Sequence, residues 1–550
     1  MGRFLASSIG VTCATALALP LTLPVSAAAA SVTSAAGLVR PARPPAAAAP
    51  AVPGSTQSLP LGPLPSDRAV GSASTARGLT ARNVQPFSLV GVIWDDPGTE
   101  LRGRVQVRTR AAGTGHWSGW QDVETHNHDH AADPGTEEGA SGAVRGSTAP
   151  LWVGASDGVE ARVQADSGAI AGPDTGDAGG AAGASALPEG LHLELVDPGE
   201  EPAPADAPTG RPAGGAQAEG ARSDGVRAEG AAPGGVRAQG AAPGGVRAEP
   251  PASDTLTASD TLASDGLTPE GLTAGELASD GLTPEGLAAD GLTSEGLADG
   301  ALAAATEAAS RANAGLAPLG ATEIPALSRE ETERELLATA PEGEQRAKPY
   351  VGPRPGIVTR RGWGADEGIR KGGFAYTKTV RAAFVHHTAT GNNYSCSQAP
   401  SVIRGIYRYH VRSSGWRDIG YNFLVDKCGT IYEGRAGGVA KPVLGAHTLG
   451  FNTNSMGIAV IGSYGSKKPS AASVQAIARL TAWKLGLFGA NPRGKTYLTS
   501  GGGNLYRKGK KVRLNVISGH RDGFATACPG RRLYSKLGTA RSDAARYQGR

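Results

Sequence analysis

The stretch GWRDIGYNFLVDKCGTIYEGR, residues 415–435, decides the fold of the C-terminal part of this 550-residue chain. Two short apolar runs within it, residues 421–425 and 430–433, flank a turn at residues 427–429 that contains glycine. Apolar runs joined by a short glycine-containing loop are typical of a β-hairpin. The stretch therefore predicts two adjacent strands of one sheet.

Apolar segments on both sides of this hairpin complete a mixed α/β domain. Buried strands are predicted at residues 379–386 (TVRAAFVH), 456–461 (MGIAVI) and 515–518. Residues 399–411 and 470–487 carry apolar side chains at helical spacing and predict two helices. We expect a mixed central sheet flanked by helices over residues 353–540.

The N-terminal half predicts a smaller β-rich domain at residues 85–198. Runs such as residues 103–110 (GRVQVRTR) and 191–196 (LHLELV) are separated by Gly, Pro and Asp. Short runs with this punctuation favour a small β-sandwich. The chain is therefore expected to be multidomain.

Two sets of side chains in the β-rich domain have both a functional and a structural interpretation. The alternation of His126, His128 and His130 is one that metal ligands use, but the polar residues around them favour a solvated loop. Four tryptophans suit either a sugar-stacking surface or a hydrophobic core, and we favour the core: Trp94, Trp117, Trp120 and Trp152.

Composition divides the rest of the chain into a leader and two polar segments. Residues 1–30 predict an export signal rather than a membrane span, because Pro20 and Pro24 interrupt their apolar run. Residues 31–84 are rich in Ala, Pro and Ser and are expected to be disordered. Residues 199–345 contain repeats such as GVRAEGAAPG, whose Gly and Pro predict a long, disordered, acidic linker rather than a solenoid.

Charge is distributed unevenly along the chain. Residues 355–550 contain 31 Lys and Arg against 7 Asp and Glu, whereas the other residues contain 23 against 43. A basic domain on an acidic tether suggests a polyanionic partner, and wall teichoic acids and nucleic acid suit the charge equally well. Basicity that only keeps the domain soluble is an equal alternative. The same two interpretations apply to the basic run Lys508, Lys510, Lys511 and Arg513.

Two histidines and a cysteine at predicted strand ends are the strongest candidates for chemistry: His386, His520 and Cys528. Two His and one Cys make an open zinc site, which leaves the fourth tetrahedral position for water. The spacing alone is only moderately specific, since a lone Cys is commonly a small core residue.

Five sequence blocks occur in one order along the C-terminal part. They are RGWGAD (361–366), FVHHTA (384–389), the 415–435 stretch, GAHTLGFNTNSMGIAVIG (445–462) and SGHRDGFATACPG (518–530). Together they resemble the peptidoglycan recognition protein and type 2 N-acetylmuramoyl-L-alanine amidase family, over about residues 355–540. Residues 85–198 resemble the β-rich segment that accompanies this domain in secreted proteins of high-GC Gram-positive bacteria.

The resemblance implies an exported, zinc-dependent amidase. Such an enzyme hydrolyses the amide between the lactyl group of N-acetylmuramic acid and L-Ala of the peptidoglycan stem peptide. His386, His520 and Cys528 match the zinc ligands of the family. The adjacent His387 is interpreted as structural, because neighbouring side chains on a strand face opposite ways. Binding-only members of the family lose the cysteine ligand, so Cys528 favours catalysis.

Other residues take their roles from the same blocks. Tyr421 matches the catalytic tyrosine, and Thr526 stands where active members carry Thr or Lys. Blocks that line the cleft nominate four substrate-binding residues, each with a packing role as the alternative: His410, Trp416, His447 and Asn452. Glu433 is a weaker candidate for a general base, and a partner for a neighbouring Arg is the stronger interpretation.

The resemblance also accounts for the cysteines. With Cys13 in the export signal and Cys528 as a metal ligand, Cys396 and Cys428 remain and are expected to form a disulfide. Animal members have a disulfide whose second cysteine follows the Trp of the GW block. Arg417 stands at that position here, so the expected pairing is a local substitute.

The expected partner is peptidoglycan, with anionic wall polymers as a second candidate. We expect no nucleic-acid partner, no membrane span, a monomer, and a location outside the cell or in its wall. A non-catalytic module that binds peptidoglycan is the first alternative function. A structural wall protein, and a zinc amidase or endopeptidase that cuts elsewhere in the stem peptide, are the others.

Overall fold

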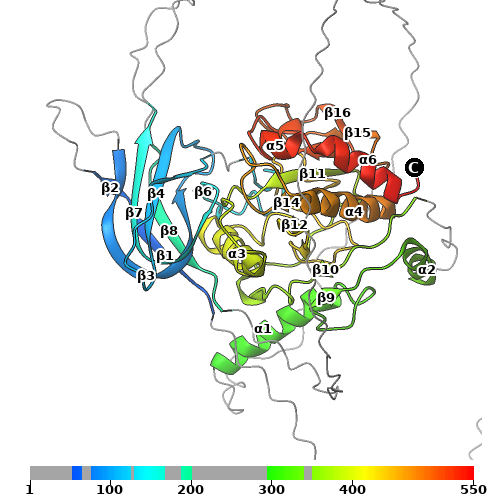
Figure 1. The fold of residues 1–550 in the computed structure, drawn as a ribbon, viewed down its shortest axis with the longest axis horizontal. Coiled ribbons are helices and arrows are strands. Elements are labelled where there is room, and N and C mark those ends of the chain that lie inside the picture. Colours follow the sequence, from blue (N-terminus) through cyan, green and yellow to red (C-terminus); the bar gives the residue numbers. More distant parts are fainter. Residues whose placement is uncertain (1–52, 65–75, 126–128, 167–186, 201–293, 340–349) are drawn as a thin grey trace, which may run out of the picture. The chain divides into compact units, whose positions relative to one another are not determined.

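The computed structural model describes residues 53–64, 76–125, 129–166, 187–200, 294–339 and 350–550 (Figure 1). All of these described residues belong to one unit. The export signal expected at residues 1–30 and the repeats at residues 201–293 lie outside the described residues. Within the described part, no helix has both the length and the apolar character needed to cross a bilayer.

The N-terminal domain is an antiparallel sheet of eight strands in the order β1-β8-β3-β7-β4-β5, with β2 and β6 paired to β3. The strands are β1 (Ser55–Pro60), β2 (Gly62–Pro63), β3 (Ala76–Trp94), β4 (Gly103–Ala111), β5 (Gln121–Val123), β6 (Gly146–Ser147), β7 (Leu151–Ala165) and β8 (His192–Asp197). Side chains such as Val105, Val107 and Leu193 fill its buried core. The β-rich prediction is confirmed.

This domain begins earlier than residue 85, the boundary that composition suggested. β1, β2 and the first part of β3 lie within residues 53–84, which were expected to be disordered. β1 pairs with β8 from Ser55 opposite Asp197 to Pro60 opposite His192. The expectation of disorder is therefore wrong for this segment. An edge strand is held by backbone hydrogen bonds, and composition does not reveal these.

The four tryptophans divide into two pairs. Trp94 and Trp152 are buried, as the core interpretation predicts. Trp117 lies at the surface and Trp120 is half-buried, with the guanidinium carbon of Arg162 4.2 Å from the centre of the Trp120 ring. The core interpretation is therefore wrong for Trp117 and holds only in part for Trp120; contacts with arginine stabilise both rings outside the core.

The C-terminal domain is built on a mixed sheet in the order β17-β11-β14-β12-β13-β10-β9. Its strands are β9 (Glu323–Ile324), β10 (Ile357–Val358), β11 (Ala382–His387), β12 (Phe423–Val425), β13 (Ile431–Glu433), β14 (Ser455–Val460) and β17 (Ile517–Gly519). β12 and β13 form the predicted hairpin, whereas β11 runs parallel to both β14 and β17. A separate ribbon of β15 (Lys495–Thr499) and β16 (Lys511–Asn515) carries part of the basic run.

Helices cover both faces of this sheet (Figure 1). They are α3 (Ala399–Arg408), which continues into a π-helical turn (Tyr409–Ser413), α4 (Ala471–Leu487), α5 (Arg531–Tyr534) and α6 (Leu537–Tyr547). α4 and α6 pack on one face against Val385 and Ile458, and α3 packs on the other against Leu424 and Ala459. The predicted mixed sheet flanked by helices is confirmed.

Residues 294–339 differ from the predicted linker. They form α1 (Ser294–Arg311), β9 and α2 (Arg329–Thr339), and β9 extends the sheet by pairing with β10. Asn313, just after α1, donates from Nδ2 to both carboxylate oxygens of Glu433 at 2.9 and 3.0 Å. These partners lie 120 positions apart in the sequence, so the local composition does not show them.

An apolar interface joins the two domains beside α3. Leu89 and Trp152 of the N-terminal domain belong to the same buried cluster as the α3 side chains. The Tyr409 hydroxyl donates to the Val92 carbonyl at 3.3 Å, and Gly91 leaves room for it, because a Cβ there would collide with that hydroxyl. The N-terminal domain is therefore packed against the α/β domain rather than only tethered to it.

A disulfide joins Cys396 to Cys428, as predicted, across a sequence separation of 32 residues. In the chain-entropy description, closing a loop of this length stabilises the fold by roughly 3–4 kcal/mol. We expect the Cys396→Ser/Cys428→Ser double variant to lose about this much free energy of unfolding, as measured by chemical denaturation beside the oxidised wild type. A loss below about 1 kcal/mol would mean that residual structure already constrains the unfolded chain there.

Candidate metal centre

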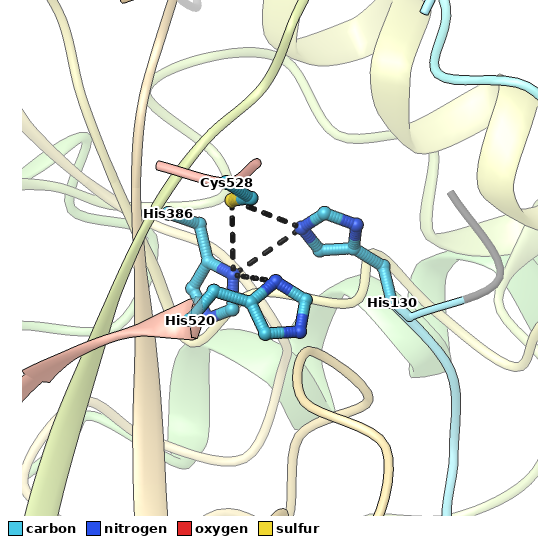
Figure 2. A group of neighbouring side chains, drawn as sticks. All are labelled: His130, His386, His520 and Cys528. Carbon is cyan, nitrogen blue, oxygen red and sulfur yellow. Dashed lines mark hydrogen bonds between the residues drawn. The ribbon is translucent and has the colours of Figure 1, made fainter. Parts of the chain in front are cut away.

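Four side chains from the two domains converge at one edge of the mixed sheet (Figure 2). His386 lies near the end of β11, and His520 directly follows β17, which runs parallel to β11. Cys528 comes from the loop that precedes α5, and His130 comes from the loop between β5 and β6 of the N-terminal domain. The sequence predicted the first three of these residues together, and the structure adds the fourth.

The four ligand atoms are close enough to hold one metal ion. They lie within 4.8 Å of one another. His386 Nδ1 is 3.1 Å from His520 Nδ1 and 3.2 Å from His130 Nε2, and Cys528 Sγ is 3.7 Å from His130 Nε2 and 3.8 Å from His386 Nδ1. Tetrahedral zinc, with bonds of about 2.0–2.3 Å to nitrogen and sulfur, separates its ligand atoms by roughly 3.3–3.6 Å. The residues therefore fit zinc.

Burial favours the protonation state that metal binding needs from the histidines. It lowers the pKa of His386 well below its usual value and lowers that of His520 to about 3. A neutral imidazole is the form that binds a metal ion. Burial also raises the pKa of the Cys528 thiol, and a cation in the centre opposes this because it stabilises the thiolate.

The Asp129 carboxylate lies beside two of the histidines, near the free nitrogen of His130 and near the His520 nitrogen that faces the centre. Its Oδ1 is 3.1 Å from His130 Nδ1, and its Oδ2 is 3.7 Å from His520 Nδ1. Burial alone would raise the pKa of this carboxyl, but His130 and His520 together lower it. A carboxylate on the free nitrogen of a metal-binding histidine fixes the ring orientation and the tautomer. His130 therefore has the surroundings of a metal ligand.

Three of the predicted residues form an aromatic group beside the centre. The His410 ring centre is 4.3 Å from that of Trp416 and 5.8 Å from that of Tyr421. The Tyr421 ring is in turn 5.6 Å from the His386 ring. Burial raises the pKa of Tyr421 well above its usual value, so its hydroxyl keeps its proton.

The remaining predicted residues lie around the same centre. His447 Nδ1 is 3.3 Å from His386 Nε2, and Thr526 is half-buried in the loop that carries Cys528. Asn452 Oδ1 accepts from the His447 backbone N–H at 2.8 Å, while its Nδ2 donates to the Ala131 carbonyl of the N-terminal domain at 2.9 Å. This contact occupies the side chain of a predicted substrate-binding residue.

The structure corrects the interpretation of the histidines in the N-terminal loop. His130 is only 5% exposed, whereas a solvated loop was expected; His126 and His128 lie outside the described residues. The alternation and the adjacent Asp129 were the available signals. These signals did not suffice, because His130 is buried by the other domain. Its partner His386 lies 256 positions away in the sequence.

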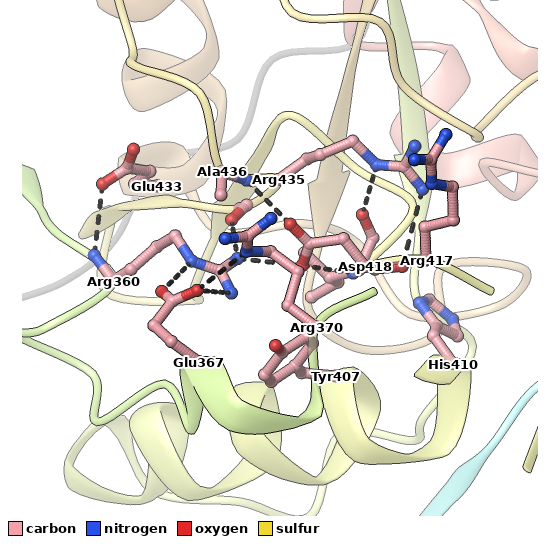
Figure 3. Close-up of polar contacts among 12 residues, drawn as sticks. Arg360, Glu367, Arg370, Tyr407, His410, Arg417, Asp418, Glu433, Arg435 and Ala436 are labelled. Atoms are coloured by element: carbon pink, nitrogen blue, oxygen red, sulfur yellow. Dashed lines mark hydrogen bonds and ion pairs between the residues drawn. The ribbon is translucent and has the colours of Figure 1, made fainter. Parts of the chain in front are cut away.

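Two further residues have structural roles. His387 accepts a hydrogen bond from the Tyr464 backbone N–H at 3.3 Å, and it is not among the four side chains of the centre. The Glu433 carboxylate accepts from Asn313 and, at 3.2 Å, from the Arg360 backbone N–H (Figure 3). Burial raises the pKa of Glu433 to about 7. Its contacts support a structural role in place of a general base.

Comparisons with known proteins agree with the two-domain organisation. One family model, described as Rv3811 N-terminal galactose-binding domain-like, matches residues 44–189, and another, described as N-acetylmuramoyl-L-alanine amidase, matches residues 376–531.

Peptidoglycan-recognition protein SC2 of Drosophila simulans is 32% identical over 185 residues, which are 33% of this chain and 85% of that protein. Peptidoglycan-recognition protein SA of Drosophila melanogaster is 34% identical over 148 residues, 27% of this chain and 69% of that protein. The solved structure of wild-type Drosophila PGRP-LB is 25% identical, with a TM-score of 0.27, over 33% of this chain and 92% of that one.

Proposed function

Because this chain belongs to the peptidoglycan recognition protein and type 2 amidase family, we propose that it is a zinc-dependent N-acetylmuramoyl-L-alanine amidase. Its substrate is the amide between the lactyl group of N-acetylmuramic acid and L-Ala of the stem peptide. The observation that carries the proposal is the convergence of His386, His520 and Cys528 with the separations that a tetrahedral ion requires. Retention of the cysteine ligand supports catalysis over recognition alone.

The residues around the centre suit amide hydrolysis. When bound, zinc makes water nucleophilic near neutral pH and polarises a carbonyl oxygen. The Tyr421 hydroxyl, which burial keeps protonated, donates a hydrogen bond to the amide oxygen as negative charge develops there. Thr526 supplies a second hydroxyl donor, and we assign substrate binding to His410 and Trp416, whose ring centres lie 4.3 Å apart beside Tyr421.

Peptidoglycan is the proposed partner, since the relatives are named for recognising it. Anionic wall polymers are proposed to contact the exposed side chains on β16 and the turn before it: Lys508, Lys510, Lys511 and Arg513. We also propose a monomer that acts outside the cell, in the wall, on the basis of the predicted export signal.

The test is digestion of purified peptidoglycan by the full chain and by a His130→Ala variant, which removes the fourth side chain from the centre. We expect at least one of the two proteins to release stem peptides that begin with L-Ala and to leave the glycan strands intact. A chelator should abolish release and added zinc should restore it. Wall binding without release by either protein would favour the recognition module, and fragments cut within the stem peptide would favour an endopeptidase.

A further inference from the structure

We propose that the N-terminal domain holds the metal centre closed, with His130 as a fourth ligand and residues 129–138 as an intramolecular cover on the adjoining surface of the α/β domain. The chain is then a latent enzyme that becomes active when this segment is displaced. Latency rests on the proposed amidase function, whereas the closed centre does not.

The first step of the argument is the position of His130. Its Nε2 points to the same place as the ligand atoms of His386, His520 and Cys528 (Figure 2). Its other nitrogen, Nδ1, lies 3.1 Å from Oδ1 of the adjacent Asp129, so a carboxylate stands close to the ring on the side away from the centre. Catalytic zinc sites keep one coordination position open, whereas sites with four protein ligands are closed. A centre that includes His130 therefore has no position left for water or substrate.

The second step is the anchoring of the segment beside His130. The Asp129 carbonyl accepts from the Leu449 backbone N–H at 3.0 Å. The buried Asp133 carboxylate accepts from the Gly450 backbone N–H at 2.7 Å and from Asn452 Nδ2 at 2.8 Å. The segment thus takes up donors of the α/β domain close to the centre, including those of a predicted substrate-binding residue. A ligand that needs these donors must displace the segment first.

An ion pair between the domains fixes the far end of the segment. The Glu138 carboxylate accepts from both terminal nitrogens of Arg435, at 2.7 and 3.0 Å, and from the Arg417 backbone N–H at 3.0 Å. Both side chains of the pair are only 8% exposed. A two-pronged contact of this kind is strong and directional. The two carboxylates, Asp133 and Glu138, therefore anchor the segment to the α/β domain at both of its ends.

The part that has to move is a loop rather than the whole domain. The segment belongs to the connection between β5 and β6, whereas the apolar interface with α3 involves β3, β7 and β8. Residues 134, 135, 137 and 140–143 are exposed, so a partner has access to the loop from outside. Displacement of the loop would open the coordination position of His130 and release Arg435 and Asn452 for an incoming ligand.

The test uses the full chain loaded with cobalt(II), whose absorption spectrum reports the number and type of its ligands. We expect azide to leave the wild-type spectrum unchanged and to shift that of His130→Ala, because only the variant has an open position. His116→Ala, which removes an exposed histidine from the same domain, should behave as the wild type. Identical spectra and identical azide responses in all three proteins would overturn the closed centre.

Peptidoglycan digestion by the same proteins separates latency from the amidase function. We expect His130→Ala to release stem peptides at least about tenfold faster than the wild type, because the closed state dominates until the segment leaves. Equal release by both proteins would overturn latency and leave the amidase in place. A spectral change without release by any protein would leave the closed centre in place and overturn the amidase.

A second variant keeps the proposal testable if His130→Ala does not fold. Asp133→Ala loosens the segment without removing a group of the centre. The loss of two hydrogen bonds to a buried carboxylate should lower the ratio of closed to open protein by about tenfold or more. We expect azide to bind this variant more readily than the wild type. An azide response equal to that of the wild type would show that the segment does not control access.

Discussion

Replacing Arg360 with Met is expected to lower the free energy of unfolding by about 3–5 kcal/mol. The guanidinium is buried among two carboxylates, with Nε 2.6 Å from Glu367 Oε1 and Nη1 3.0 Å from Asp418 Oδ1 (Figure 3). Although burial opposes its charge, Asp418 and Glu367 raise the pKa of Arg360. The substitution would leave both carboxylates without their principal cation in a place that excludes water. Chemical denaturation of the full chain measures the loss.

The neighbouring Arg361 gives a matched control, because it carries the same charge at an exposed position. Arg361→Met should change the free energy of unfolding by less than about 0.5 kcal/mol. The free energy of unfolding that Arg360→Lys loses should lie between the losses of these two variants. A lysine ammonium group cannot contact both carboxylates as the planar guanidinium does. If Arg360→Met lowered the free energy of unfolding no more than Arg361→Met does, the buried ion-pair network would not contribute to the stability of the fold.

The same network reaches Arg435, which pairs with Glu138 of the N-terminal segment. Asp418 Oδ2 accepts from the Ala436 backbone N–H at 2.9 Å, so the anchored carboxylate holds the residue that follows Arg435. Arg435 in turn donates from Nε to the Ile419 carbonyl at 2.9 Å. Two buried arginines therefore set the position of the loops around residues 418 and 435. These contacts place the Arg435 guanidinium where it meets the Glu138 carboxylate.

Much of the α/β domain could be predicted because its signals are local. β11 is an apolar run that ends in histidine, and β12 and β13 flank a turn with Gly429 at a φ of 89°, a conformation that favours glycine. His386 and His520 could be brought together because both lie at the ends of strands, and those strands proved to be parallel neighbours. Cys528 could be grouped with these histidines from its spacing, and the family blocks make the assignment of all three specific, since a lone cysteine is commonly a small core residue.

The contribution of the N-terminal domain could not be predicted from local patterns. The segment around Asp129, His130 and Asp133 is polar, which is typical of a solvated loop. It is buried because the other domain packs against it and supplies matching donors, such as the Gly450 backbone N–H and Asn452 Nδ2. Residues 294–339 were misjudged for the same reason, as the contact between Asn313 and Glu433 illustrates. Burial by a distant partner requires knowledge of the fold.

Replacing Cys528 with Ser is expected to lower zinc affinity and amidase activity by at least about 100-fold each. The thiolate is the one sulfur ligand among the four side chains of the centre, and a serine hydroxyl of similar size does not ionise near neutral pH. Activity should be compared in the His130→Ala background, so that latency does not hide the loss. Zinc content after dialysis gives a measurement that does not depend on turnover.

The Cys396→Ser/Cys428→Ser variant is the matched control, since it removes two sulfurs that lie outside the centre. Below its own unfolding temperature it should keep zinc and activity, although it is less stable. Far-ultraviolet circular dichroism should show Cys528→Ser folded, because the exchange leaves the buried volume almost unchanged. A folded Cys528→Ser protein that retained wild-type zinc affinity would remove the sulfur from the ligand set. If the variant retained activity without zinc, the reaction would not depend on the metal. Ligation of the metal by His130 could then not explain latency.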